Sequence, residues 1–142
     1  MATRSTISKL NPDGTYTTIY CHWDGYPEHV GKMLYMHYNT EERVDELLSL
    51  GDISSLHPLV APPDGVNHTF DNPYPDVTVA YHRDRGEEFH ITHSLSISEI
   101  KDKFGQETIL WNYLWKNGKW YYSNHKLNFE ELKIFFKSRY NE

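Results

Sequence analysis

The chain has 142 residues, 38% of them apolar and 24% charged, a balance typical of a folded domain. Its 20 acidic residues outnumber its 14 Lys and Arg residues, and the net charge of −6 argues against binding a nucleic-acid duplex. A single cysteine excludes an internal disulfide, and no stretch is apolar enough to predict a membrane span. We therefore expect one domain over residues 1–142, cytoplasmic and without a membrane partner.

A β-hairpin is predicted at the start of the chain. Two β-rich runs, residues 6–10 and 15–22, flank the turn sequence Asn-Pro-Asp-Gly at 11–14. Side chains alternate along a strand, so Ile19 and Cys21 share one face, and we expect both to be buried.

Two helices are predicted to follow the hairpin. The apolar spacing changes to a helical period over 27–38, with a proline in the first turn, and this pattern places His37 in the core. Asn39 and Glu42 resemble a capping box for a second helix, which Gly51 would end.

The middle of the chain is predicted to be irregular. Residues 52–75 hold five of the seven prolines and are expected to form a long loop. Alternation predicts a strand over 76–82, a turn at 83–86 and a returning strand over 88–93. A short helix is expected over 97–105, closed by a glycine.

The clearest local signal is a second hairpin near the end. The runs 109–115 and 119–123 flank Asn117-Gly118, a dipeptide strongly typical of tight hairpins. Asn128 and Glu131 again resemble a capping box, here for a terminal helix. The fold class we predict is α+β, with a mostly antiparallel sheet from two hairpins plus a middle strand, and three to four helices.

The stretch CHWDGYPEHVGK, residues 21–32, is the first candidate site. It lies where a strand is expected to pass into a helix, whose free N–H groups attract anions. On this hypothesis His22, Trp23, Asp24 and Tyr26 line a pocket for an anion or nucleotide. The alternative is a stiff corner in which Asp24 caps backbone amides and Trp23 fills the core.

A second candidate is the stretch from Tyr81 to Glu88, in which His82, Arg83 and Arg85 are the predicted binding residues. Arg83 and Arg85 flank one residue beside a glycine and would suit a fork for phosphate or carboxylate. In the alternative interpretation this is a polar turn in which Asp84 pairs with the arginines.

The nine histidines raise the question of metal binding or catalysis. His22, His82 and His90 would be the best ligands, but no recognisable ligand spacing supports them, so we expect no metal or other cofactor. The His-x-Thr element at 90–92 is typical of two-histidine phosphoesterases, but only one copy is present. A hydrolase would use His22 or His90 as general acid/base with Asp24 orienting it.

Four segments of the chain carry a resemblance: CHWDGYPEHVGK, GDISSL, AYHRDRGE and YLWKNGKWYYSN. They are similar to segments of small, functionally unassigned accessory proteins from bacteriophages and prophages. The resemblance implies expression inside a bacterial host cell, where such proteins often counter host defence. By analogy, the chain would bind a host factor or sequester a small anionic, nucleotide-like ligand.

Three functional hypotheses follow. The first is a non-enzymatic binding protein of the kind just described. The second is an interaction module that exposes the aromatic strands between Trp111 and Tyr122 to a partner or to a second copy. The third is a small hydrolase of a phosphodiester or nucleotide, which requires a histidine and a carboxylate in contact within a cleft.

Overall fold

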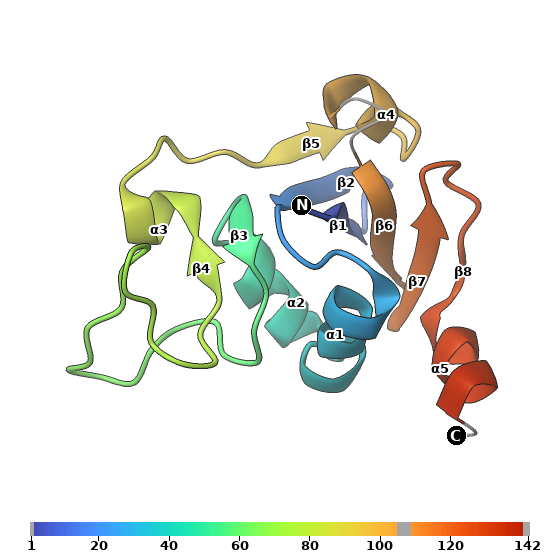
Figure 1. The fold of residues 1–142 in the computed structure, drawn as a ribbon. Coiled ribbons are helices and arrows are strands. Elements are labelled where there is room, and N and C mark those ends of the chain that lie inside the picture. The colour runs from blue at the N-terminus through green and yellow to red at the C-terminus, as the bar shows by residue number, and fades with distance from the viewer. Residues whose placement is uncertain (1, 105–108, 141–142) are drawn as a thin grey trace.

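The structure is a computed structural model, and it describes residues 2–104 and 109–140. Figure 1 shows a curved sheet with helices packed around it. The elements in chain order are β1 (Arg4–Leu10), β2 (Tyr16–Cys21), a π-helical turn (Pro27–Gly31), α1 (Lys32–His37), α2 (Glu41–Leu48), β3 (Ile53–Ser55), β4 (Val79–Ala80), α3 (Tyr81–Arg85), β5 (Thr92–Ser94), α4 (Glu99–Phe104), β6 (Ile109–Lys116), β7 (Lys119–Asn124), β8 (Glu130–Glu131) and α5 (Leu132–Tyr140).

These elements confirm the predicted α+β class. The sheet order is β4-β3-β2-β1-β6-β7-β8, and β5 also pairs with β2. The pairs β1–β6 and β2–β3 are parallel, whereas the others are antiparallel, so the sheet is mixed but mostly antiparallel.

Both predicted hairpins are present. The β1–β2 hairpin reverses through Gly14, and the β6–β7 hairpin reverses through Asn117 and Gly118, which both have positive φ. This conformation is the one that Asn-Gly adopts readily in a tight hairpin turn.

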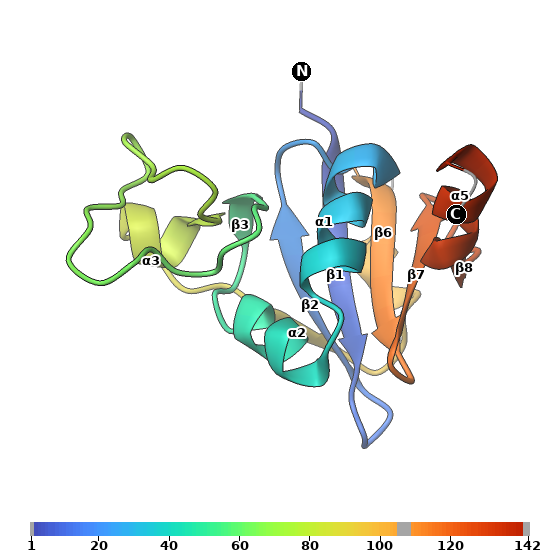
Figure 2. The same cartoon turned by 90° about the horizontal axis from the view of Figure 1, so that it is seen from below.

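One face of the sheet carries the apolar core. Ile7, Ile19 and Tyr113 lie side by side on β1, β2 and β6, and all are fully buried. Figure 2 shows α1 and α2 covering this face. Cys21 is buried in the same cluster, as its alternation with Ile19 predicted.

The opposite face is buried but polar. Thr6 pairs with Tyr20 and Asn112 across the three central strands, and its hydroxyl donates to the Asn112 side chain. The Ser8 and Thr18 hydroxyls meet at 2.7 Å. Hydrogen bonding between neighbours satisfies these buried groups.

The middle of the chain corrects two predictions. The segment 52–75 is not wholly a loop, because Ile53–Ser55 forms β3. The strand predicted over 76–82 is shorter than expected: Val79–Ala80 forms β4 and Val77 makes an isolated bridge with Leu59, but Tyr81–Arg85 turns into a helix. That helix ends at Gly86, whose φ of 76° gives the left-handed cap that glycine favours.

The predicted helix caps also need correction. The α2 cap is Thr40, whose side chain accepts from the Arg43 amide, rather than Asn39. The capping box at Asn128 is wrong, since Glu130–Glu131 pairs with β7 and α5 begins only at Leu132. His37 is exposed, not a core residue.

The other two elements of the middle lie close to their predictions. The returning strand is β5, Thr92–Ser94, which is shorter than the predicted 88–93. The short helix is α4, and its predicted end at Gly105 lies outside the described residues. Among the described residues, no helix combines the length and apolar character that a membrane crossing requires.

Candidate functional site

The sheet forks along the outer edge of β2. Near the start of β2, Thr18 pairs with Thr92 of β5, whereas at its end Cys21 pairs with Ile53 of β3. The strands β3 and β5 therefore diverge beside Tyr20. A polar side chain occupies the gap between them.

Asp52 fills the gap. Its Oδ1 accepts a hydrogen bond of 2.9 Å from the Tyr20 amide, in the place of a neighbouring strand's carbonyl. Its own amide donates to the His90 carbonyl, and its carbonyl accepts from the Tyr81 amide. One residue thus ties together β2, the start of α3 and the chain that leads into β5.

Gly51 delivers Asp52 to this position. It follows α2, which ends at Leu48 and not at Gly51 as predicted. Gly51 has a φ of 75°, and a Cβ there would lie 2.7 Å from the His90 carbonyl oxygen. A side chain at residue 51 would therefore push the His90 segment away from Asp52.

His90 completes a carboxylate–imidazole pair with Asp52. Its Nδ1 lies 2.6 Å from the Asp52 Oδ2, and the carboxylate acceptor assigns the proton to Nδ1. The His90 side chain is 62% exposed and that of Asp52 only 18%. Burial raises the pKa of Asp52 above 3.8, although the hydrogen bonds from Tyr20 and His90 act in the opposite direction.

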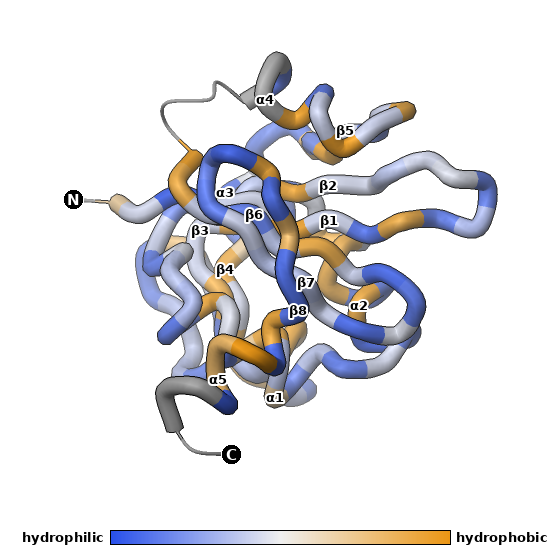
Figure 3. Tube along the Cα trace, turned by 90° about the vertical axis from the view of Figure 1, so that its right-hand side faces the viewer, coloured by the Kyte–Doolittle hydropathy of each residue, from blue (hydrophilic) through white to orange (hydrophobic). Residues whose placement is uncertain are grey.

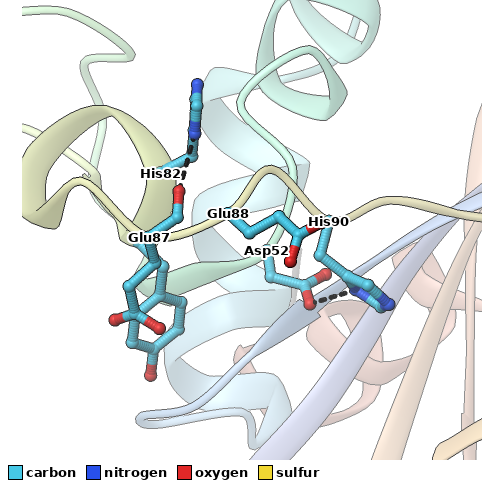
Figure 4. Close-up of a pocket in the computed structure, with 6 residues that line it drawn as sticks. Asp52, His82, Glu87, Glu88 and His90 are labelled. Atoms are coloured by element: carbon cyan, nitrogen blue, oxygen red, sulfur yellow. Dashed lines mark hydrogen bonds and ion pairs between the residues drawn. The ribbon is translucent and has the colours of Figure 1, made fainter.

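A cavity of about 210 Å³ opens over this pair, and Figure 4 shows its lining. We call it the acidic cavity, and it is lined by Asp52, Tyr81, His82, Glu87, Glu88 and His90. Among the described residues, no lysine or arginine belongs to this lining. Three carboxyl groups without a lining cation favour a positively charged or hydrogen-donating ligand.

The predicted arginine fork does not form. Arg83 binds Asp84 through Nε at 2.8 Å and also donates to the carbonyls of Val60 and Thr78. Arg85 pairs with Glu87 at 3.3 Å and covers the ring of Phe70. Both guanidinium groups hold the protein together instead of pointing into the acidic cavity.

Asp84 explains why Arg83 is fixed. Its side chain is 2% exposed and accepts from the Ala80 amide and from His68. Burial acts to raise the pKa of Asp84, but the hydrogen bonds from Arg83 and Ala80 outweigh it, so the pKa is lowered. The pairing of Arg83 with Asp84 matches the structural alternative for this stretch.

Of the seven residues predicted to bind a ligand, His82 is the one that lines the acidic cavity. Its Nδ1 donates to the Glu87 carbonyl at 2.7 Å (Figure 4), and its ring meets the edge of Phe89.

The corner at 21–32 is stiff. The amides of His22 and Trp23 continue the pairing with β3, and the Gly25 amide donates to the Thr3 carbonyl. Tyr113 donates its hydroxyl to the Gly25 carbonyl at 2.6 Å. A Cβ on residue 25 would lie 2.7 Å from the Thr3 oxygen, so the close approach is to backbone and not to a ligand.

Two details of the predicted corner are wrong. Trp23 is 43% exposed and does not fill the core, and no side chain caps the π-helical turn, so Asp24 is not its cap. His22 meets the Tyr20 hydroxyl at 2.6 Å and the edge of the Trp23 ring. Tyr26 is 37% exposed and reaches Asp24 at 3.4 Å.

Two further possibilities are a metal site and a cysteine nucleophile. No group of three or more His, Cys, Asp or Glu side chains in the described residues is arranged to hold a metal ion. Burial raises the pKa of the Cys21 thiol to about 12, which keeps it a protonated core residue.

Three of the six rings on the aromatic strands are buried, and the other three are partly buried. Tyr113, Trp115 and Trp120 are at most 4% exposed, and the half-buried Trp111 stacks on Tyr122. This burial counts against an interaction module built on these rings.

Sequence reasoning missed Asp52, and it assigned no role to Tyr81, Glu87 or Glu88, although these three lie in the second candidate stretch. The available signal was Gly51-Asp52 after a predicted helix, but nothing local linked it to a histidine 38 residues away. No protein-family model matches the sequence, and neither a curated protein nor a solved structure is similar to it at a significant level.

Proposed function

We propose that this chain is a non-enzymatic accessory protein of a bacteriophage or prophage that binds a host protein in the bacterial cytoplasm. The acidic cavity is the recognition site, and it receives a lysine or arginine side chain of the partner. The observation that carries this proposal is a lining with three carboxyl groups and no lysine or arginine among the described residues. Glu87 is shared with Arg85, which lies outside the lining, whereas Glu88 has no ion-pair partner among the described residues.

The size of the cavity supports a side chain as its occupant. At about 210 Å³ it is smaller than the roughly 300–1,000 Å³ typical of pockets for whole small molecules. A flexible cationic side chain needs only a narrow opening, and its charge is met chiefly by Glu88, because Glu87 already pairs with Arg85 and Asp52 with His90.

The net charge of the whole chain also favours a basic partner. A net charge of −6 attracts basic partners over a distance and repels small anions. Phe89, which is 44% exposed between Glu88 and His90, offers apolar contact beside the cavity. The sequestration of an anion by Arg83 and Arg85 is not part of this proposal, since both are already paired.

Zero-length carbodiimide cross-linking in bacterial lysate tests the proposal. The reagent joins a carboxyl group to a lysine amine only when the two are in contact. We expect peptides that contain Glu87 or Glu88 to be joined to a lysine of one host protein. The double variant Glu87→Gln/Glu88→Gln should lose the link.

The matched control is Glu42→Gln, on the exposed surface of α2 and away from the cavity. It should leave the cross-link unchanged. Cross-links only through carboxylates outside the acidic cavity, or an equal yield from the double variant, would show that the acidic cavity is not the recognition site.

The contact between Asp52 and His90 favours a second candidate, a hydrolase. A buried carboxylate that orients an exposed imidazole is the arrangement of a general base, and its Nε2 remains available to activate water. However, phosphoryl chemistry needs positive charge around the phosphate, and no described lysine or arginine lines this cavity.

An assay with bis(p-nitrophenyl) phosphate separates the two candidates. The binding proposal predicts no turnover above buffer for the unaltered chain. Turnover that His90→Ala and Asp52→Asn both abolish would instead establish the hydrolase.

A further inference from the structure

A second cavity lies at the other side of the molecule, where α1 and α5 meet the β6–β7 hairpin. It has a volume of about 390 Å³, within the usual range for small-molecule sites. We call it the aromatic cavity, and it is lined by Tyr35, Asn39, Trp115, Gly118, Lys119, Trp120, Glu131 and Lys133. In Figure 3 the apolar start of α5 lies beside β7 and β8 at this end.

Three rings form the walls of the aromatic cavity. Trp115 and Trp120 meet at 5.3 Å between ring centroids, and the partly buried Tyr35 packs on Phe136. The indole N–H of Trp115 donates to Glu41, and that of Trp120 donates to the Tyr38 carbonyl, both at 2.7 Å. These bonds fix both indoles, which are only 2% and 4% exposed, so the partly buried Tyr35 is the ring with surface to offer a ligand.

The rim of the aromatic cavity is polar and carries more positive than negative charge. Lys119 is only 3.8 Å from Glu131, a weak and largely exposed pair. Lys133 has no ion-pair partner among the described residues, and the side-chain amide of Asn39 has no hydrogen-bond partner among them. Two lysines against one glutamate make this rim cationic in a chain of net charge −6.

We infer that the aromatic cavity binds a planar aromatic compound that carries a negatively charged group. The ligand ring lies against Tyr35, above the packed indoles, and the anion reaches Lys119 and Lys133 at the rim. The Asn39 amide is placed to bond a polar edge of the ring. The anion can be the phosphate of a nucleotide or the carboxylate of a smaller aromatic acid, since both share this chemistry.

Indole signals in an NMR titration test the inference. The chain has four tryptophans, so a ¹H–¹⁵N spectrum gives four indole signals, which single Trp→Phe variants assign. Adenosine monophosphate and indole-3-acetate are the two anionic probes, and adenosine and inorganic phosphate are their matched halves. We expect the Trp115 and Trp120 signals to move while Trp23 and Trp111 remain in place.

Comparison of the probes identifies the source. A larger effect of adenosine monophosphate assigns the site to nucleotides, and a larger effect of indole-3-acetate assigns it to aromatic acids. Lys133→Glu should lower the affinity for the better-binding probe about five-fold or more, because it reverses a charge at the rim. Lys126→Glu, in the exposed segment after β7, is the control and should have no comparable effect.

The inference is wrong if both anionic probes leave Trp115 and Trp120 unmoved at millimolar concentration. It is also wrong if Lys133→Glu binds the better probe as tightly as the unaltered chain. The variant changes an exposed side chain, so its fold can be verified by the unchanged signals of Trp23 and Trp111. None of these outcomes affects the acidic cavity, which uses other residues.

Discussion

The two cavities are built in opposite ways. The acidic cavity lies at a fork in the sheet and depends on one carboxylate, Asp52, that replaces a missing strand contact beside Tyr20. The aromatic cavity lies at the β7–β8 end of the sheet and depends on packed rings such as Trp120. The first arrangement selects a ligand by charge and hydrogen bonding, and the second by shape with charge only at the rim.

This difference has a consequence for stability. A cavity held by a buried carboxylate should respond to the loss of one hydrogen bond and to pH. A cavity held by packed rings should respond chiefly to lost volume. The following predictions test that contrast, from the largest expected effect to the smallest.

The largest effect is expected for Trp120→Ala. The Trp120 ring is 4% exposed and lies in the core cluster, so its removal should lower the free energy of unfolding by about 3–5 kcal/mol. Urea denaturation measures this loss. Trp23→Ala, at a ring that is 43% exposed, is the control and should cost below about 1 kcal/mol. Equal losses would show that the aromatic cavity is not a packed part of the core.

Asp52→Ala should have the next largest effect. It leaves the Tyr20 amide without its acceptor at the fork, which costs about 1–3 kcal/mol. Asp52→Asn keeps an oxygen for this amide and should cost much less. Urea denaturation gives both values, and hydrogen exchange should show faster opening at the Tyr20 amide in Asp52→Ala alone. The same loss in both variants would mean that charge, and not this hydrogen bond, holds the fork.

The third prediction concerns pH. Burial raises the pKa of Asp52, so ionisation is less favourable in the folded chain than in the unfolded chain. The stabilising contribution of this group is therefore complete below its unfolded value of 3.8 and is lost as pH rises through its folded pKa. Stability measured for Asp52→Asn, relative to the unaltered chain, should rise over that window and then level off.

The double variant Asp52→Asn/His90→Ala, compared with His90→Ala, sharpens the pH prediction. His90 acts to lower the pKa of Asp52, so its removal should extend the window to higher pH. A relative stability of Asp52→Asn that falls as pH rises would contradict the assigned direction of the shift.

The smallest effects are expected at the rims. Glu88→Gln and Lys133→Ala change exposed side chains and should each alter stability by about 0.5 kcal/mol or less. Thermal unfolding measures both. A larger change in either variant would mean that the side chain supports the fold, and the binding experiments would then need a different substitution.

The sequence correctly predicted the structural features that neighbouring residues determine. Asn117-Gly118 specified a tight hairpin, and its flanking runs became β6 and β7 with little change. Alternation along β2 correctly placed Cys21 in the core. These features depend on backbone conformations that a few adjacent residues determine.

Prediction failed where contacts between residues that are distant in the sequence determine the structure. The alternation of Val77, Val79 and Tyr81 resembled a strand, but Asp84 accepts from the Ala80 amide and the chain turns into α3. The sequence offered the pairing of Arg83 with Asp84 as one of two interpretations of this stretch, but it could not decide between them. Arg83 is also fixed by its hydrogen bonds to the carbonyls of Val60, which lies in the irregular segment, and of Thr78, which follows it.

Neither cavity could be read from the sequence. The Asp52–His90 pair exists because β3 and β5 both join the edge of β2, and local sequence does not specify that register. In the aromatic cavity, Trp115 and Trp120 are hairpin neighbours, but Tyr35 and Lys133 come from helices at opposite ends of the chain.

The most direct test of the central claim is an NMR titration with N-acetyl-lysine amide, a free analogue of the proposed cationic side chain. The His90 imidazole signals, assigned with His90→Gln, report on the acidic cavity. The account predicts that these signals shift, that Glu88→Gln reduces the shift, and that the Trp115 and Trp120 indole signals stay in place. Unmoved His90 signals at saturating probe, or shifts unaffected by Glu88→Gln, would contradict recognition of a basic side chain at this site.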